Sequence, residues 1–566
     1  MKKLMLRRWV LPILCTLLFG MIWFYLKLPP INIKSLDFWI LIGVLAIVFL
    51  VIKFLFCLEF MYKEGFKKKD IYKNVNAKIG YFKIPMNFRK SDYNFKFIIK
   101  IVLILVVIII VGGIVVWVTS SEIFNAKAYH DQMQVVEGNF QEDISEVPLS
   151  QIPIVDKATA IKLGNRELGE MADLVSQFEI SDIYTQINYN NSQIRVSPLM
   201  YGDLIKWFTN QGDGIPYYVK INIATQETNL VKTQDPIKYS PYEHFSRYLK
   251  RHLRFLYPFD MFETPVFELD DTGRPFWVVP VYEYEIGVIG GKDIVSVIVV
   301  DAATGESQKY NIGEVPQWID NVFPAKLLNI QANNWGKYSN GWVNSIFSQR
   351  NVVTTASGYN SIVLNGDLWM YTGLTSVTDD QSNVGYILSN MRTKETKFYQ
   401  IKGANEESAM RSAEGKVQEK KYNATFPILV NIADKPTYFL SLKDDAGLIK
   451  QFAFVCAEQY QIVGVGDSLL LAQNAYIQQL KANGANVYEE SNFKAGNIID
   501  INMAVVDGNT NYYFKLKDEP NLIFVAPISV SYNLPFIKIG DYVETKYTER
   551  DSSENLKTIN EIKIVM

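Results

Sequence analysis

The stretch VSVIVVDAATGESQKY, residues 295–310, decides the fold of this chain because it occurs in two further versions. They are YYVKINIATQETNLV at residues 217–231 and GYILSNMRTKETKFY at residues 385–399. Each is an apolar strand, a polar turn of the form Thr-x-Glu-[Ser/Thr] and a second strand. Thr225, Thr304 and Thr393 set a common register, 79 and 89 residues apart. The pattern predicts repeated hairpins in which the Thr hydroxyls bond nearby backbone groups.

Helices and alternating strands flank these hairpins. Helical periodicity is found at residues 157–171, 242–256 and 406–420, and alternating strand candidates lie between each helix and the hairpin or turns that follow it. A helix laid on one face of a small antiparallel sheet buries both apolar faces. We therefore predict four α+β modules after a polar connector at residues 120–155: residues 156–235, 236–313, 314–400 and 401–485.

The second module resembles the PepSY domain, whose closing hairpin often reads V-D-x-x-T-G. The matching residues are Val299 to Glu306, whereas Gln226 and Lys394 replace the glycine in modules one and three. The resemblance implies a regulatory or inhibitory role toward a protease or a wall hydrolase. The whole chain also resembles uncharacterised membrane proteins of low-GC Gram-positive bacteria, some of them assigned to the CvpA family.

The C-terminal stretch, residues 486–566, has a different texture. Five short strand candidates follow one another, with a turn at Asp507-Gly508-Asn509-Thr510 and a late Gly540-Asp541 entry into a strand. This spacing predicts a small β-barrel of the OB type.

Three apolar stretches near the N-terminus meet the length expected for crossing a bilayer, which is about 20 residues. They are Trp9–Leu26, Phe38–Leu58 and Ile101–Val118. The predicted fold class is therefore membrane α, with three N-terminal transmembrane helices in residues 1–119, followed by extracytoplasmic α+β repeat modules and a C-terminal small OB-like β-barrel.

Charge sets the expected orientation. Residues 1–100 hold 18 Lys/Arg and 5 Asp/Glu, which leaves 39 and 54 for residues 101–566. Ten of the cations lie in residues 61–96, the loop between the second and third stretches. Since basic loops stay in the cytoplasm, we expect a multi-pass protein with a cytoplasmic N-terminus and residues 120–566 outside. The basic loop needs no partner beyond the phospholipid bilayer.

The expected compartment is a bacterial envelope. Cys15 and Cys57 lie within the apolar stretches, and Cys456 stands alone in the outer part. No disulfide can form within that part, whereas a large extracellular protein of an animal is usually disulfide-bonded.

No catalytic motif emerges. His244 and His252 are eight residues apart, which is not the spacing that brings two imidazoles to one metal, and His130 is isolated. The acid pairs Asp270-Asp271 and Asp444-Asp445 occupy turns, where acids are expected for structural reasons. We predict no enzyme, no cofactor and no metal.

The basic helix at residues 242–256 supplies the candidate binding residues, Arg247, Arg251 and Arg254. Its mixture of cations and aromatics suits a nucleic acid, an anionic lipid or an ordinary amphipathic helix. The acidic balance of the outer part argues against nucleic acid. The leading hypothesis is a non-catalytic envelope protein whose modules bind a protein or peptide, with an accessory subunit of a membrane complex or an envelope-acting enzyme as alternatives. The oligomeric state is left open.

Overall fold

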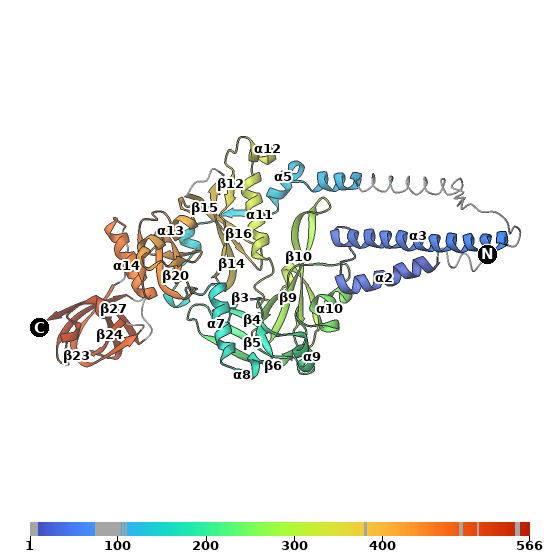
Figure 1. Cartoon of the computed structure of the whole chain (residues 1–566). Helices are drawn as coiled ribbons and strands as arrows, with labels where there is room; N and C mark the ends of the chain where they lie inside the picture. The colour runs from blue at the N-terminus through green and yellow to red at the C-terminus, as the bar shows by residue number, and fades with distance from the viewer. Residues whose placement is uncertain are drawn as a thin grey trace.

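Helices extend from one end of the molecule, a barrel closes the other, and four sheets lie between them (Figure 1). The computed structural model describes residues 10–73, 104, 107, 110–377, 382–485, 491–506, 509–548 and 555–565. This described part is mostly β-rich, with four separate open sheets and one closed barrel.

The predicted fold class is wrong in its three transmembrane helices. Only α3, Leu36–Lys73, contains a described segment that is long and apolar enough to cross a membrane, Leu36–Phe56, with a mean hydropathy of 2.8. The described part of the first predicted span is α2, Leu11–Lys27, an apolar helix of 17 residues that rises about 25 Å, and Trp9 lies outside the described residues. The third predicted span lies partly outside the described residues. A multi-pass protein is thus not supported.

The four sheets share one topology. In each unit a helix is followed by two short strands that both pair with the same third strand, and the third, fourth and fifth strands run as an antiparallel meander. Unit 1 consists of α7 (Lys157–Gly169), α8 (Ala172–Val175), β2 (Phe178–Ile180), β3 (Thr185–Tyr189), β4 (Ser192–Tyr201), α9 (Leu204–Asn210), β5 (Ile215–Asn222) and β6 (Thr228–Ile237). Unit 2 consists of a 3-10 turn (Phe245–Arg247), α10 (Leu249–Leu256), β7 (Met261–Phe262), β8 (Val266–Leu269), β9 (Pro275–Ile286), β10 (Gly290–Asp301) and β11 (Ser307–Asn311).

Units 3 and 4 repeat the order. Unit 3 consists of α11 (Ala325–Tyr338), α12 (Gly341–Ile346), β12 (Val353–Thr355), β13 (Asn360–Leu364), β14 (Asp367–Ser376), β15 (Ser382–Asn390), β16 (Thr396–Tyr399) and β17 (Gly403–Ala404). Unit 4 consists of α13 (Glu406–Lys416), β18 (Asn423–Ala424), β19 (Ile428–Ile432), β20 (Lys435–Lys443), β21 (Ile449–Cys456), β22 (Val463–Gly466) and α14 (Leu469–Ala482). One hydrophobic cluster contains Val196, Trp277, Tyr371 and Phe439, one from each unit, so the units pack on each other as one body.

The Thr-x-Glu turns adopt one conformation in the first three units. The Thr hydroxyls of Thr225, Thr304 and Thr393 accept the backbone N–H two residues on, at 3.2–3.3 Å. The following residue is left-handed in every case, with φ of 65° at Gln226, 78° at Gly305 and 67° at Lys394. Non-glycine residues therefore take the strained position in units 1 and 3.

This strain leads to a stability prediction. Gln226→Gly should raise the free energy of unfolding by about 0.5–1 kcal/mol, because glycine adopts the left-handed region without a Cβ clash. Gly305→Ala should lower it, since a Cβ there would lie 2.5 Å from the Tyr239 ring. Thermal unfolding of the full chain in detergent measures both, and equal melting temperatures for Gln226→Gly and the unsubstituted chain would refute the first.

The segment at residues 120–155 is packed against the units instead of forming an open connector. Its elements are α5 (Glu122–Asp131), β1 (Val135–Glu137), α6 (Phe140–Asp143) and a 3-10 turn (Leu149–Gln151). The carbonyl of Ile144 accepts the side-chain amide of Asn431 at 2.8 Å, and the carbonyl of Ile154 accepts the Ser441 hydroxyl at 2.9 Å. The segment thus passes along units 3 and 4 before entering unit 1.

The C-terminal strands close into a barrel in the order β23-β24-β25-β27-β26. They are β23 (Ser491–Val506), β24 (Asn509–Leu516), β25 (Glu519–Pro527), β26 (Tyr542–Thr548) and β27 (Leu556–Val565). The long β23 pairs with both β24 and β26, while β25 and β27 run parallel. The assignment of this barrel to the OB type stays a prediction.

Candidate functional site

The outer edge of β16 in unit 3 is occupied by another part of the chain. β1 lies parallel to β16, with Val135 opposite Thr396 and Glu137 opposite Phe398. The N–H of Gly138 donates to the carbonyl of Phe398 at 2.9 Å. Unit 3 thus already binds an extended segment by strand addition, a mode in which backbone hydrogen bonds hold the added strand.

The same edge is open in units 1 and 2. The common turn register makes Leu230 of β6 and Lys309 of β11 the counterparts of Phe398, each five residues after its Thr. β6 and β11 are the terminal strands of their sheets, and no strand in the described part of the chain pairs with their outer sides. In unit 4, the backbone of α14 comes close to Gly464 of β22.

Backbone groups at the two edges face outward. Asn222 N–H donates to the carbonyl of Glu227 at 2.8 Å, and Asp301 N–H donates to the carbonyl of Glu306 at 2.9 Å. Hydrogen-bonded pairs alternate along an antiparallel ladder. The backbone groups of Leu230 and Lys309 therefore point away from their own sheets, as those of Phe398 do toward β1.

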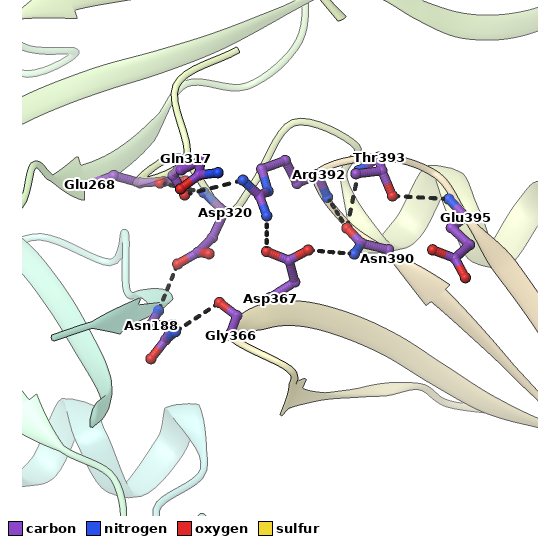
Figure 2. A network of polar contacts seen from close by, with 10 residues as sticks. All are labelled: Asn188, Glu268, Gln317, Asp320, Gly366, Asp367, Asn390, Arg392, Thr393 and Glu395. Carbon is purple, nitrogen blue, oxygen red and sulfur yellow. Dashed lines mark hydrogen bonds and ion pairs between the residues drawn. The ribbon is translucent and has the colours of Figure 1, made fainter. Parts of the chain in front are cut away.

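A network of polar contacts joins units 1, 2 and 3 (Figure 2). The carboxylate of Glu268 on β8 is fully buried and accepts the backbone N–H groups of Asp320 and Asn321, both at 3.0 Å, and the side-chain amide of Asn321 at 2.9 Å. The Asp320 carboxylate accepts the backbone N–H of Asn188 on β3 at 2.6 Å. We call these residues, with Asp367 and Arg392, the junction network.

Unit 3 supplies the charged half of the junction network. Arg392 forms an ion pair with Asp367, whose other oxygen accepts the side-chain amide of Asn390 at 2.8 Å. Asn188 donates its side-chain amide to the carbonyl of Gly366 at 2.7 Å. These hydrogen bonds hold the sheets of units 1, 2 and 3 in fixed positions relative to each other.

Burial raises the pKa of both carboxyls in the junction network, and Glu268 raises that of Asp320 further by repulsion. Three N–H donors favour the ionised form of Glu268, whereas Asp320 accepts one. Protonation is therefore favoured more at Asp320 than at Glu268. Both side chains are almost completely buried. Neither Glu268 nor Asp320 lines the hollows beside Asp156, Phe140 and His244. This geometry suits a structural junction, not a catalytic dyad.

The candidate residues of the basic helix have three different surroundings. Arg254 lies inside the protein, 2% exposed, and not on the surface as expected of a candidate binding residue. Its guanidinium donates to the carbonyls of Leu28, Tyr257, Pro258 and Asp260. Arg251 stacks on the Tyr25 ring, with Cζ 4.0 Å from its centroid. Arg247 donates to the carbonyl of Gln211.

The histidines and the acid pairs do not converge. His244 packs edge-on against Trp207 at 4.8 Å, the ring of His252 bonds the carbonyl of Gly305 at 2.8 Å, and His130 pairs with Asp131. Asp270 accepts the backbone N–H groups of Thr272 and Arg274, and Asp444 accepts that of Leu448, all at 2.9 Å. Within the described residues no group of His, Cys, Asp and Glu could hold a metal ion.

Comparisons with known proteins identify no relative. No protein-family model matches the chain, and no curated protein matches it. Among solved structures, Trypanosoma rangeli sialidase is 8% identical with a TM-score of 0.18, over 68% of this chain and 54% of the sialidase. An ancestral GH74 enzyme is 10% identical with a TM-score of 0.15, over 60% of this chain and 41% of that enzyme. The chain spans about half the length of these structures, and TM-scores this low carry no argument about fold or function.

Proposed function

We propose that this chain is a non-catalytic, membrane-anchored protein whose units 1 and 2 bind an extended segment of a protein partner along β6 and β11. The observation that carries the proposal is the pairing of β1 with the equivalent edge of unit 3. Since the three hairpins share one turn conformation and register, an added strand meets the same backbone geometry in all three units.

Lysine and proline residues on the two edge strands favour a partner other than a second copy of this chain. β6 carries Lys232 and Pro236, and β11 carries Lys309. Such residues on an edge strand discourage pairing between identical strands, while a partner of complementary sequence is still accommodated.

In this proposal, α3 anchors the chain in the membrane. Lys34, two residues before α3, donates to the carbonyl of Tyr284 in unit 2, and the far end of α3 contains Lys67, Lys68 and Lys69. Because basic ends remain in the cytoplasm, the far end of α3 would lie on the cytoplasmic side of a bacterial membrane and its first turn on the outer side. PepSY-like regulation of a protease or wall hydrolase is one form that such binding would take.

A proline scan of β11 tests the binding edge. A photo-crosslinking residue at Gln308, used in intact cells, should capture a partner protein through β11. Lys309→Pro should reduce the yield about tenfold, because the outward N–H and its hydrogen bond are lost. Lys309→Ala is the matched control, since it removes the side chain and keeps the N–H.

The comparison of the two variants decides the result. Capture that falls with Lys309→Pro and persists with Lys309→Ala supports strand addition. Equal capture by both variants would overturn it, as would a loss that Lys309→Ala reproduces.

A further inference from the structure

Six large apolar side chains of units 1 and 2 are exposed to between 59% and 77%. They form what we call the apolar patch: Leu204, Ile205 and Phe208 on α9, Phe245 in the turn before α10, Phe255 on α10, and Phe259 after it. Soluble surfaces rarely leave so many large apolar residues together, and such patches mark a contact with a membrane or a partner.

Ring contacts connect the patch to the apolar helices. Trp207 lies 6.3 Å from Phe208 and 5.8 Å from Phe245, so α9 packs on the turn before α10. Phe255 meets Phe24 of α2 edge-on at 6.0 Å. Helix α10 lies beside the near end of α2, and α9 lies below α10 (Figure 1). The patch is therefore next to the apolar surface of α2 and α3.

The same location is rich in cations. Arg251 donates to the carbonyl of Tyr25 at 3.2 Å and lies over its ring, and Lys250 is exposed on the adjacent position of α10. Lys206 of α9 reaches Asp203 at 3.6 Å. Aromatic residues with Lys and Arg at the end of an apolar helix have the composition of a segment in the headgroup layer of a bilayer.

We infer that the apolar patch lies in the headgroup layer of the bilayer that α3 spans, so that units 1 and 2 rest on the lipid surface. This inference rests on the proposed anchoring through α3. The occupant is lipid because the patch continues the exposed apolar surface of α2 and α3, where Leu26 and Ile47 are more than 60% exposed. The cations beside it complement anionic headgroups.

Environment-sensitive labels on the full chain in lipid nanodiscs test the inference. Cys15, Cys57 and Cys456 are replaced by alanine, and melting must match that of the unsubstituted chain. Single cysteines then carry an NBD fluorophore in Ile205→Cys, in Ile47→Cys of α3 and in the exposed barrel control Met503→Cys. Headgroup-proximal spin-labelled lipid should quench Ile205→Cys at least about twofold and leave Met503→Cys unchanged, and a deep spin label should quench Ile47→Cys.

A second measurement, made without the fluorophore, tests whether the fluorophore itself is attracted to lipid. Ile205→Cys should react more slowly with a charged, water-soluble maleimide in nanodiscs than in detergent, while the rate for Met503→Cys stays equal. Quenching at Ile47→Cys without quenching at Ile205→Cys would overturn the patch and keep the anchor. Absence of quenching at both would overturn the anchor. Protection of Ile205→Cys without lipid quenching would show that protein covers it, and would also overturn the inference.

Discussion

Arg254→Ala is expected to destabilise the chain by about 3–5 kcal/mol and to release the loop between α2 and α3 from unit 2. The guanidinium donates to Leu28, Tyr257, Pro258 and Asp260, and its Cζ lies 4.4 Å from the centre of the Phe262 ring. Burial lowers the pKa of Arg254 to about 10. This value is still above neutral pH, so the guanidinium stays protonated. Truncation would leave several carbonyls without a donor and open a cavity beside Phe262.

Hydrogen exchange locates the effect. The N–H of Ile31 donates to the carbonyl of Pro258 at 2.8 Å, so its exchange reports whether the loop stays docked. In Arg254→Ala this amide should exchange much faster, while amides of the C-terminal barrel should be unaffected. Lys250→Ala, on the exposed face of the same helix, is the matched control and should change neither melting nor exchange. Unchanged protection at Ile31 in Arg254→Ala would contradict the assigned role.

Local chemistry explains which features the sequence could reveal. The Thr-x-Glu turns depend on hydrogen bonds between residues that are close in the sequence. The three hairpins and their register can therefore be predicted from the sequence. Strands are expected between the helix at residues 242–256 and its hairpin, and β8, Val266–Leu269, is one of them. Helix α11 went unrecognised because Gln331 and Asn334 lie among its buried residues and interrupt the apolar periodicity.

Long-range packing explains the rest. In the sequence Arg254 resembles any other cation on a basic helix, and its bond to Leu28, more than 200 residues earlier, cannot be inferred from it. Glu268 and Asp320 meet because units 1, 2 and 3 pack together, and no local pattern announces a buried acid in Phe267-Glu268-Leu269. Length and apolarity predicted the first membrane span, whereas the described helix α2 has 17 residues. The surroundings of Arg254 and the junction network both depend on residues that are distant in the sequence.

The second large effect is a loss of stability with rising pH that Asp320→Asn should largely remove. Burial and Glu268 raise the pKa of Asp320 to about 8, whereas an unfolded aspartate titrates near 4. The folded chain therefore binds more protons than the unfolded chain between these values. The contribution of Asp320 is fully present below about pH 4 and is lost as the pH rises through about 8.

Asparagine reproduces the protonated acid. Its carbonyl oxygen can accept the N–H of Asn188, and its amide can donate as the carboxylic acid does. At pH 9 we expect Asp320→Asn to be about 2 kcal/mol more stable than the unsubstituted chain, which must hold two buried carboxylates next to each other. At pH 5 the two should be nearly equal. Melting temperatures of both chains from pH 5 to 9 give the comparison, with Asp271→Asn in an exposed turn as the control. Parallel pH profiles for Asp320→Asn and the unsubstituted chain would contradict the raised pKa of Asp320.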